Sequence, residues 1–397
     1  MLYRTVPKTG DQLSILGFGC MRLAQKDGRI DEARAAHQIH SAIDRGVNYI
    51  DTAWPYHGGE SEPFVGRALA GGYRERVKLA TKLPAWLVKE RADMDRFLDA
   101  QVHKLATDRI DYYLVHSLTG DVWDRAAALG VAEFLDRAKA DGRIVNAGFS
   151  FHGLLADFKR IVDGYPWEFC QIQYNYLDEE LQAGKEGLKY AASKGLAVIV
   201  MEPLRGGTLA VSPPPPAIED LWREADMRRT PAEWALRWVW NQPEVTLALS
   251  GMNDEAQVEE NLRIAGDAQA GALTAAEVSL IGRVGRKYRE MMKVACTGCG
   301  YCQPCPSGVD IAGSFDLLNA YHTFGKEREA GFLYVVRAGG VLSGHPAYAS
   351  LCARCLECLE KCPQNLPIPD LLEQVVIQFE GAGLKEREAM VRGFFGG

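Results

Sequence analysis

Short apolar runs rich in β-branched and aromatic residues alternate with longer stretches of helical period over about the first 265 residues. Such runs, bounded by glycine and polar residues, predict β-strands. The expected strands are residues 14–19, 49–53, 77–82, 110–116, 144–150, 169–174, 196–201 and 245–250. Helical patterns follow the strands, for example at residues 32–46, 61–72, 94–106 and 232–242. The pattern therefore predicts eight successive βα units.

Eight βα units of this length predict a closed (β/α)₈ TIM barrel, a fold that typically needs about 250 residues. The alternative is a doubly wound sheet, whose first strand usually runs into a G-x-G-x-x-G turn. The segment GFGCMR at residues 17–22 lacks the third glycine and opens no immediate helix. We therefore favour the barrel.

The cysteines are concentrated in the last quarter of the chain, after the predicted βα units. Eight of the ten lie after residue 295, and the first 290 residues hold only Cys20 and Cys170. The net charge of −7 gives no reason to expect a nucleic-acid partner. No run approaches the ~18 apolar residues of a membrane span, and the first residues lack a signal-peptide pattern. We expect a cytoplasmic protein without a membrane partner, in which clustered thiols bind metal more often than they form disulfides.

Four polar residues follow or end neighbouring strands of the predicted barrel. Asp51 lies near the end of the second strand, Tyr56 five residues later, Lys82 at the end of the third and His116 at the end of the fourth. Barrel enzymes carry their catalytic groups at this end of the strands. Each residue alone has an ordinary structural explanation, such as a cap or a rim histidine, but the four together predict a catalytic site.

These four groups suit the reduction of a carbonyl by hydride. Hydride addition leaves an alkoxide that needs a proton, and a free tyrosine, with a pKa of ~10, holds one at neutral pH. A neighbouring lysine stabilises the phenolate that remains. We expect Asp51 to position Lys82, Tyr56 to donate the proton and His116 to orient the substrate oxygen.

The segments DTAWPYHGGESEPFVGRAL (51–69), LATKL (79–83) and YYLVHS (112–117) resemble the catalytic blocks of the aldo-keto reductases. The resemblance extends to about residue 265 and implies NADP(H) or NAD(H) as hydride donor. It implies cofactor contacts at Met21, Arg22, Asp51, Ser150, Gln173, Glu202, Leu204, Arg205, Gly206, Ser250, Gly251, Met252, Gln257, Glu260 and Asn261.

The chain departs from the family pattern at three places around the expected cofactor. Phe151 stands where asparagine is usual beside the carboxamide, and Met201 where an aromatic residue often stacks on the nicotinamide. Asp254 and Glu255 occupy the segment in which NADPH-preferring members carry a basic residue, and acidic groups repel a 2′-phosphate. The family favours NADPH, Arg205 or Arg263 offer compensating charge, and NADH stays an alternative.

The clustered cysteines form two runs, each followed by proline. The first run is Cys296, Cys299, Cys302 and Cys305. The second run is Cys352, Cys355, Cys358 and Cys362. The second has the C-x₂-C-x₂-C-x₃-C-P spacing of bacterial ferredoxins, in which the fourth cysteine of each run ligates the other cluster. We therefore expect two [4Fe–4S] clusters with Cys362 and Cys305 exchanged; zinc is the alternative, but it needs only two cysteines from each half.

The residues between the runs, 314–329 and 331–340, have helical patterns. The tail thus resembles the α-helical ferredoxins, and the whole layout resembles the iron–sulfur branch of the aldo-keto reductases. We expect a barrel at 1–272, a linker helix at 273–295, a ferredoxin-like domain at 296–380 and a terminal tail at 381–397. A metal-stapled stability module is the alternative reading of this tail.

These features predict an enzyme that interconverts a small carbonyl substrate and its alcohol. An electron-transfer protein is the alternative, because hydride transfer moves two electrons and needs no cluster. In that case the clusters would pass electrons to a redox protein partner. A third hypothesis is that the clusters sense redox state.

Overall fold

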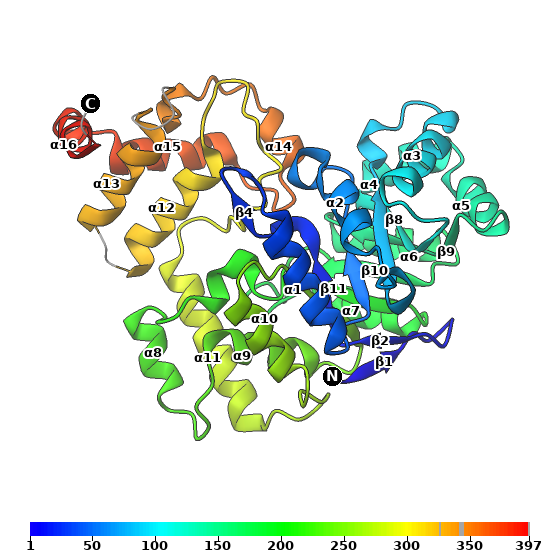
Figure 1. Cartoon of the computed structure of the whole chain (residues 1–397). Coiled ribbons are helices and arrows are strands. Elements are labelled where there is room, and N and C mark those ends of the chain that lie inside the picture. Colours follow the sequence, from blue (N-terminus) through cyan, green and yellow to red (C-terminus); the bar gives the residue numbers. More distant parts are fainter. Residues whose placement is uncertain (325–326, 341–344, 396–397) are drawn as a thin grey trace. The chain divides into compact units, whose positions relative to one another are not determined.

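The computed structural model describes residues 1–324, 327–340 and 345–395. It divides into two compact units. The barrel unit comprises Met1–Leu204 and Arg229–Val278, and the tail unit comprises Arg205–Arg228 and Ser279–Gly397. Figure 1 shows the strands and most of the helices of the barrel unit in blue to green; in the tail unit α8 is green and the residues from α11 onward run from yellow to red.

Eight parallel strands close into a barrel in the order β10-β11-β12-β3-β6-β7-β8-β9. Their bounds are β3 Leu16–Gly19, β6 Tyr49–Asp51, β7 Lys78–Leu83, β8 Ile110–Leu118, β9 Ile144–Phe151, β10 Phe169–Gln173, β11 Ala197–Met201 and β12 Val245–Ser250. Strands that follow one another in this series are neighbours, and β12 closes the ring on β3. All eight expected strands are present, and the predicted barrel is confirmed.

Helices follow the strands of the barrel, as the 3.6-residue period predicts. Those of the barrel unit are α1 Glu32–Asp44, α2 Ser61–Ala68, α3 Arg91–Lys104, α4 Gly120–Ala128, α5 Val131–Ala140, α6 Leu155–Asp163, α7 Gly184–Ser193, α9 Pro231–Trp240 and α10 Glu255–Ile264. After α5 and α7, Gly142 and Gly195 adopt φ values of 80° and 73°, the left-handed conformation that ends a helix before the next strand.

A short hairpin that the sequence pattern does not predict precedes the barrel. Its strands are β1 Tyr3–Thr5 and β2 Gln12–Ser14, and they pair antiparallel. Val6 and Leu13 are fully buried in one cluster with barrel residues such as Tyr49, Tyr112 and Phe169. The hairpin therefore fills part of the barrel core. A second hairpin joins β4 Gln25–Lys26 to β5 Arg29–Ile30.

The regular secondary structure in the described residues of the tail unit is helical, as predicted. Its helices are α8 Pro216–Trp222, α12 Ile311–Phe324, α13 Glu327–Ala338, α14 Glu357–Lys361, α15 Ile368–Phe379 and α16 Leu384–Phe395. The expected linker helix is α11, Ala275–Met291, whose first turn belongs to the barrel unit. Residues 325–326, inside the first helix expected between the cysteine runs, lie outside the described residues.

The helices of the tail pack around a core of their own (Figure 1). Val309, Phe315, Tyr334 and Val375 are buried in this core, and six cysteines of the two runs pack against it. The described residues also contain the 3₁₀ helices η1 Cys20–Arg22, η2 Tyr56–Gly59, η3 Arg74–Arg76, η4 Ala85–Leu87, η5 Arg205–Ala210 and η6 Ala349–Leu351. None of the helices in the described part of the chain has the length and apolar character needed to span a membrane.

The packing of α2 against the end of α3 gives a stability prediction. A Cβ at Gly66 would lie 2.8 Å from the Lys104 carbonyl oxygen and 2.8 Å from the Leu105 carbonyl carbon, which are backbone atoms that cannot turn aside. We expect Gly66→Ala to lower the free energy of unfolding by ~1–3 kcal/mol, the usual cost of overpacking. Urea denaturation followed by circular dichroism measures this loss.

Gly282→Ala is the matched control, because its Cβ would meet only the end of the Arg286 side chain at 3.9 Å. Alanine is the better helix former by ~1 kcal/mol, so this variant should be no less stable than the parent. If Gly66→Ala were as stable as Gly282→Ala, the close packing of α2 on α3 would be contradicted.

Candidate active site and cysteine clusters

Lys82, near the end of β7, lies at the centre of the predicted catalytic group, and its side chain is fully buried. Its ammonium donates to Asp51 Oδ1 at 2.6 Å, to the Thr52 carbonyl at 2.8 Å and to Tyr56 Oη at 3.3 Å. An ammonium has three donors, and all three have an acceptor here. The structure thus brings three of the four predicted side chains into one hydrogen-bonded group.

His116 completes the set on β8. Its ring lies 6.2 Å from the Tyr56 ring between centroids, in an edge-to-face arrangement. The Lys82 ammonium also lies 4.9 Å from the centroid of the Tyr56 ring. Tyr56 itself begins η2, a turn in which His57 has a φ of 52° and the next two residues are glycines. The four predicted residues therefore share one rim of the barrel.

Asp51 has a second partner, which the sequence analysis did not identify. Gln171 on β10 donates to Asp51 Oδ2 at 3.1 Å. Burial raises the pKa of the Asp51 carboxyl, and the Lys82 ammonium and the Gln171 amide oppose that rise. Residues i and i+2 of a strand face the same side. Because Gln173 was expected in the site, Gln171, two residues earlier, could also have been expected to face it.

A buried network of polar side chains forms hydrogen bonds to the backbone of Lys82 and to its neighbour Thr81. Glu62, whose side chain is fully buried, accepts hydrogen bonds from Thr81 and Gln101, both at 2.7 Å. Gln101 also donates to the Lys82 carbonyl at 2.9 Å. Lys104 lies 3.4 Å from the Glu62 carboxylate. Because each buried polar group finds a partner, this network fixes the end of β7 where the ammonium is presented.

The environment of His116 keeps its imidazole neutral. Burial lowers the pKa of His116 well below its ordinary value, and the charges of Lys82 and His152 lower it further. The Trp86 ring lies 5.1 Å from the imidazole. A neutral ring has one donor and one acceptor nitrogen, and so can donate a hydrogen bond to a substrate oxygen without carrying charge.

Ser150, one of the predicted carboxamide contacts, accepts a hydrogen bond from the Ser117 amide at 2.7 Å. Ser117 adopts a φ of 54°, which a non-glycine residue rarely does. Phe151, at the family's asparagine position, is buried and packs edge-to-face on Phe158 with 5.1 Å between ring centroids. This position therefore offers no amide to a ligand.

Gln173, the other predicted carboxamide contact, is buried on β10. Its amide nitrogen donates to Asp178 Oδ2 at 2.9 Å, and its oxygen accepts from Gln182 at 3.3 Å. Asn175 donates to the same Asp178 oxygen at 3.0 Å. The loop after β10 thus holds the Gln173 side chain in one orientation.

Four of the expected cofactor contacts lie where β3, β11 and β12 end. Arg22 in η1 forms an ion pair with Glu202, with 3.6 Å between the charged atoms. A Cβ at Gly251 would meet the Arg22 Cβ at 3.0 Å, so the glycine allows η1 to approach β12 closely. Met21 is half-buried beside Arg22 in η1.

Leu204 is half-buried, and it is the last residue of the first segment of the barrel unit. Ser250 ends β12 and accepts a hydrogen bond from Asn261 on α10 at 3.0 Å. Met252 is buried directly after this strand.

On α10, Gln257 accepts from the Asn253 amide at 3.1 Å, and Glu260 accepts from the Thr230 hydroxyl at 2.5 Å. The amino end of α10 therefore has an ordered loop before it.

The two acidic residues at the start of α10 are neutralised in part by one arginine. Arg34 on α1 donates to Asp254 Oδ2 at 3.0 Å and to Glu255 Oε1 at 2.8 Å. The Arg34 hydrogen bonds, supported by Gln38, lower the pKa of Glu255 to about 2. Asp254 also caps the helix by accepting from the Ala256 amide at 2.9 Å. A ligand at this end of α10 would therefore lie near the Arg34 guanidinium and the two carboxylates that it pairs with.

Arg205 and Gly206, the last two expected cofactor contacts, belong to the tail unit. The Arg205 side chain is 2% exposed. Its guanidinium donates to the Ala295 carbonyl at 3.0 Å and lies 3.9 Å from the Met292 sulfur. Gly206 has a φ of 65° in η5.

The eight clustered thiols form two groups, and within each group the thiols influence one another electrostatically. Burial raises the pKa of the Cys302 thiol to about 12, and the charges of Cys299, Cys296 and Cys362 add to this rise. Burial likewise raises the pKa of Cys296; Cys362 adds to the rise, whereas the Gly298 amide and the Arg205 guanidinium oppose it. The group around the first run therefore includes the last cysteine of the second.

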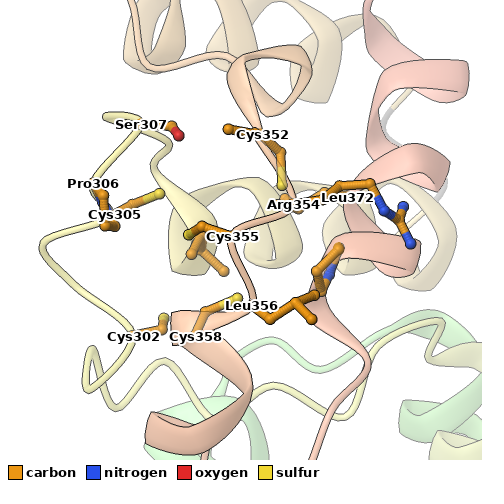
Figure 2. A pocket seen from close by; sticks show the side chains of 13 residues that line it. Cys302, Cys305, Pro306, Ser307, Cys352, Arg354, Cys355, Leu356, Cys358 and Leu372 are labelled. Carbon is orange, nitrogen blue, oxygen red and sulfur yellow. The ribbon is translucent and has the colours of Figure 1, made fainter.

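The second group has the reciprocal composition. Burial raises the pKa of the Cys358 thiol, and Cys352, Cys355 and Cys305 add to the rise. A pocket lined by these four cysteines, together with Cys302, lies in the tail unit. Figure 2 shows these cysteines around one space, with Cys305 on the opposite side from Cys352. The last cysteine of the first run thus lies with the second.

This donor set fits iron–sulfur clusters. In the described residues, no three cysteine, histidine or acidic side chains converge closely enough to hold one metal ion. A [4Fe–4S] cluster takes four thiolates at its corners, which leaves the thiols wider apart than a tetrahedral zinc site does. The two groups of four thiols, with no histidine among them, have the number and type of ligands that two such clusters need.

Comparisons with known protein families match the barrel region to one family and the cysteine-rich region to another. Residues 15–281 match the model of the aldo/keto reductase family. Residues 295–367 match the model of the 4Fe-4S dicluster domain.

Curated relatives match the barrel region. One is the L-galactose dehydrogenase of Arabidopsis thaliana, which is 26% identical over 279 residues, covering 65% of this chain and 86% of the relative. Another is the 6-dehydroglucose reductase of Novosphingobium aromaticivorans, which is 28% identical over 279 residues, covering 65% of this chain and 88% of that protein.

Solved structures agree on the fold. The holo form of an aldo-keto reductase from Bacillus halodurans superimposes with a TM-score of 0.61 at 27% identity, covering 72% of this chain and 96% of that one. An aldo/keto reductase from Klebsiella pneumoniae, solved with NADP and acetate, gives a TM-score of 0.58 at 23% identity, covering 72% and 95%.

The grouping of the thiols makes a reciprocal prediction. Cys362→Ser should disturb the cluster that contains Cys296, and Cys305→Ser should disturb the cluster that contains Cys352, because each fourth ligand serves the other run. Iron and sulfide analysis of anaerobically purified protein, with electron paramagnetic resonance of the reduced clusters, measures the effect. We expect about eight iron and eight sulfide in the parent chain and loss of one distinct signal in each variant. Cys296→Ser and Cys352→Ser identify which signal belongs to which cluster. If Cys362→Ser lost the signal that Cys352→Ser loses, and not the one that Cys296→Ser loses, the exchanged grouping would be wrong.

Proposed function

Because the chain belongs to the aldo/keto reductase family and carries a 4Fe-4S dicluster domain, we propose that it is an NAD(P)H-dependent oxidoreductase. It transfers hydride between the nicotinamide and a small carbonyl or alcohol. The observation that carries this proposal is the hydrogen bond from the buried Lys82 ammonium to the Tyr56 hydroxyl at 3.3 Å.

The residues at the rim have distinct tasks in this reaction. The bound nicotinamide supplies the hydride. Tyr56 donates its phenolic proton to the carbonyl oxygen as the alkoxide forms, and the fixed charge of Lys82 stabilises the phenolate that remains. Asp51 holds the ammonium in place through a 2.6 Å contact. Neutral His116 donates a hydrogen bond to the same substrate oxygen and thereby orients the carbonyl.

The nucleotide end of the site determines the choice between NADP(H) and NAD(H). NADP is in the name of one relative, a Schizosaccharomyces pombe aldo-keto reductase that is 24% identical over 291 residues. The amino end of α10 presents backbone amides, which favour a phosphate. The carboxylates of Asp254 and Glu255 repel the 2′-phosphate that distinguishes NADP(H) from NAD(H), and Arg34 offsets their negative charge only in part. We therefore propose that the protein accepts both nucleotides.

We propose two [4Fe–4S] clusters in the tail. Cys296, Cys299, Cys302 and Cys362 hold the first cluster. Cys305, Cys352, Cys355 and Cys358 hold the second cluster. Such clusters supply one-electron transfer when bound. Thiolate ligands of this kind fit a compartment in which thiols stay reduced, and we therefore propose a cytoplasmic location.

Electron transfer to a redox protein is the second candidate function. One observation favours it: Cys355, a proposed ligand of the second cluster, is exposed, whereas the other seven clustered cysteines are partly buried. A cluster close to the surface can exchange electrons with a partner. Both functions use the same nicotinamide, and they differ in whether the electrons leave as a hydride or singly.

The role of Tyr56 leads to a kinetic prediction. Tyr56→Phe should lower kcat for carbonyl reduction by ~10²-fold or more, the usual effect of removing a general acid, because it removes the hydroxyl that the Lys82 ammonium contacts. NADPH-dependent reduction of 4-nitrobenzaldehyde measures it, with nucleotide binding followed by fluorescence. Tyr73→Phe, which removes an exposed hydroxyl bonded to Asp44, is the control. Near-parental turnover by Tyr56→Phe would eliminate Tyr56 as the acid.

The acidic pair leads to a prediction about nucleotide preference. We expect the parent protein to prefer NADPH over NADH by less than a hundredfold, which is ~2.8 kcal/mol. Glu255→Gln removes one charge beside the expected 2′-phosphate and should raise the preference by about fivefold, close to the ~1 kcal/mol of a solvated charge pair. Fluorescence titration with both reduced nucleotides measures the two affinities.

Glu259→Gln is the matched control, since Glu259 lies one turn further along α10 and pairs with Arg45. It makes the same charge change, and the preference should stay within twofold of the parent. A parental preference above a hundredfold, or equal shifts in both variants, would show that other groups set the nucleotide choice.

A further inference from the structure

Arg205 links the loop after β11 to the first cysteine run within the tail unit. Its side chain is 2% exposed, and its guanidinium donates to the carbonyl of Ala295 at 3.0 Å. Ala295 is the residue directly before Cys296. Sulfur of Met292 lies 3.9 Å from the other end of the same guanidinium. An arginine therefore contacts the backbone at the point where the chain enters the cluster-binding run.

The backbone at this position supports a role for the side chain. Arg205 has a φ of 49°, and the next two residues, Gly206 and Gly207, have φ values of 65° and 100°. A left-handed conformation favours glycine, because a Cβ crowds the following carbonyl. The loop thus holds a large side chain in a conformation that the two glycines beside it adopt without strain, which indicates that the guanidinium has a use there.

The Arg205 guanidinium contacts the carbonyl of the residue bonded to Cys296, so its positive charge lies next to the first cysteine of the run. A guanidinium is costly to bury unless negative charge compensates it. Four thiolates make the cluster of the first run a negatively charged group. The negative charge of the cluster therefore offsets the cost of burying the Arg205 guanidinium, and the guanidinium stabilises that negative charge.

We propose that Arg205 is a positioning residue of the first cluster, holding the Ala295 carbonyl and placing a fixed positive charge beside Cys296. Cluster potentials depend on local charge and hydrogen bonds. Because reduction adds an electron, a nearby positive charge favours the reduced state and raises the reduction potential. This inference rests on the proposed cluster at Cys296, Cys299, Cys302 and Cys362, and it differs from the nucleotide contact that the family resemblance implies for Arg205.

An anaerobic redox titration of the full chain, followed by electron paramagnetic resonance, tests this role. The first cluster is identified as the signal that Cys362→Ser disturbs. We expect Arg205→Gln to lower the equilibrium constant for reducing that cluster by about tenfold, which is ~59 mV for one electron. Arg205→Lys keeps the charge and should shift the constant less. Arg283→Gln removes a positive charge from an exposed ion pair with Glu224 in the same unit and should shift neither cluster.

Two outcomes would overturn the proposal. One is an unchanged potential of the first cluster in Arg205→Gln with all iron retained. The other is weaker binding of NADP⁺ to Arg205→Gln with no change of potential, which would assign the guanidinium to a nucleotide phosphate. If Arg205→Gln loses the first cluster, Arg205→Lys decides, because a cluster retained in this variant supports the role of the positive charge and a cluster lost in both variants contradicts it. Iron analysis of the parent protein tests the cluster assignment separately. A parent protein without iron would contradict the proposed clusters, whatever the Arg205 variants do.

Discussion

The buried ammonium of Lys82 is the constraint on which the rest of the site depends. Removing such a charge from water costs several kcal/mol unless hydrogen bonds and an opposite charge replace the solvent. Asp51, the Thr52 carbonyl and Tyr56 supply these partners, and Gln171 satisfies the second oxygen of the carboxylate. Loss of any one of them would leave a buried group unpaired.

The barrel register makes this arrangement possible. Asp51 is paired with Ala80 across the β6–β7 ladder, so Lys82 lies two residues further along β7 on the same face. The ammonium can therefore reach the carboxylate on one side and the phenol beyond the end of β6 on the other. A one-residue shift of β7 would turn Lys82 away from the barrel interior and leave the acid alone.

The sequence predicted those parts of the site that follow a period or a strand end. The eight strands follow from short apolar runs that alternate with helical patterns, and the four candidate catalytic residues follow from polar side chains where those apolar runs stop. Gln101 and Glu62, which support Lys82, were not predicted, because their contact joins α3 to a residue 39 positions earlier. Arg205 was expected at the nucleotide, yet its guanidinium contacts Ala295, 90 positions away. Local patterns carry no information on such pairings, which only the closed fold creates.

The proposed function places two redox chemistries in one chain, a two-electron site on the barrel and a one-electron site in the tail. Deuterium labelling separates them most directly. The protein is incubated anaerobically with NADPH deuterated at C4 and with 4-nitrobenzaldehyde, and the alcohol product is examined by mass spectrometry while the visible spectrum of the clusters is followed. Direct hydride transfer predicts one deuterium on the carbinol carbon of the product and oxidised clusters throughout turnover. A product without deuterium, formed while the cluster absorption bleaches, would contradict catalysis by the Lys82–Tyr56 pair and would assign the electrons to the clusters.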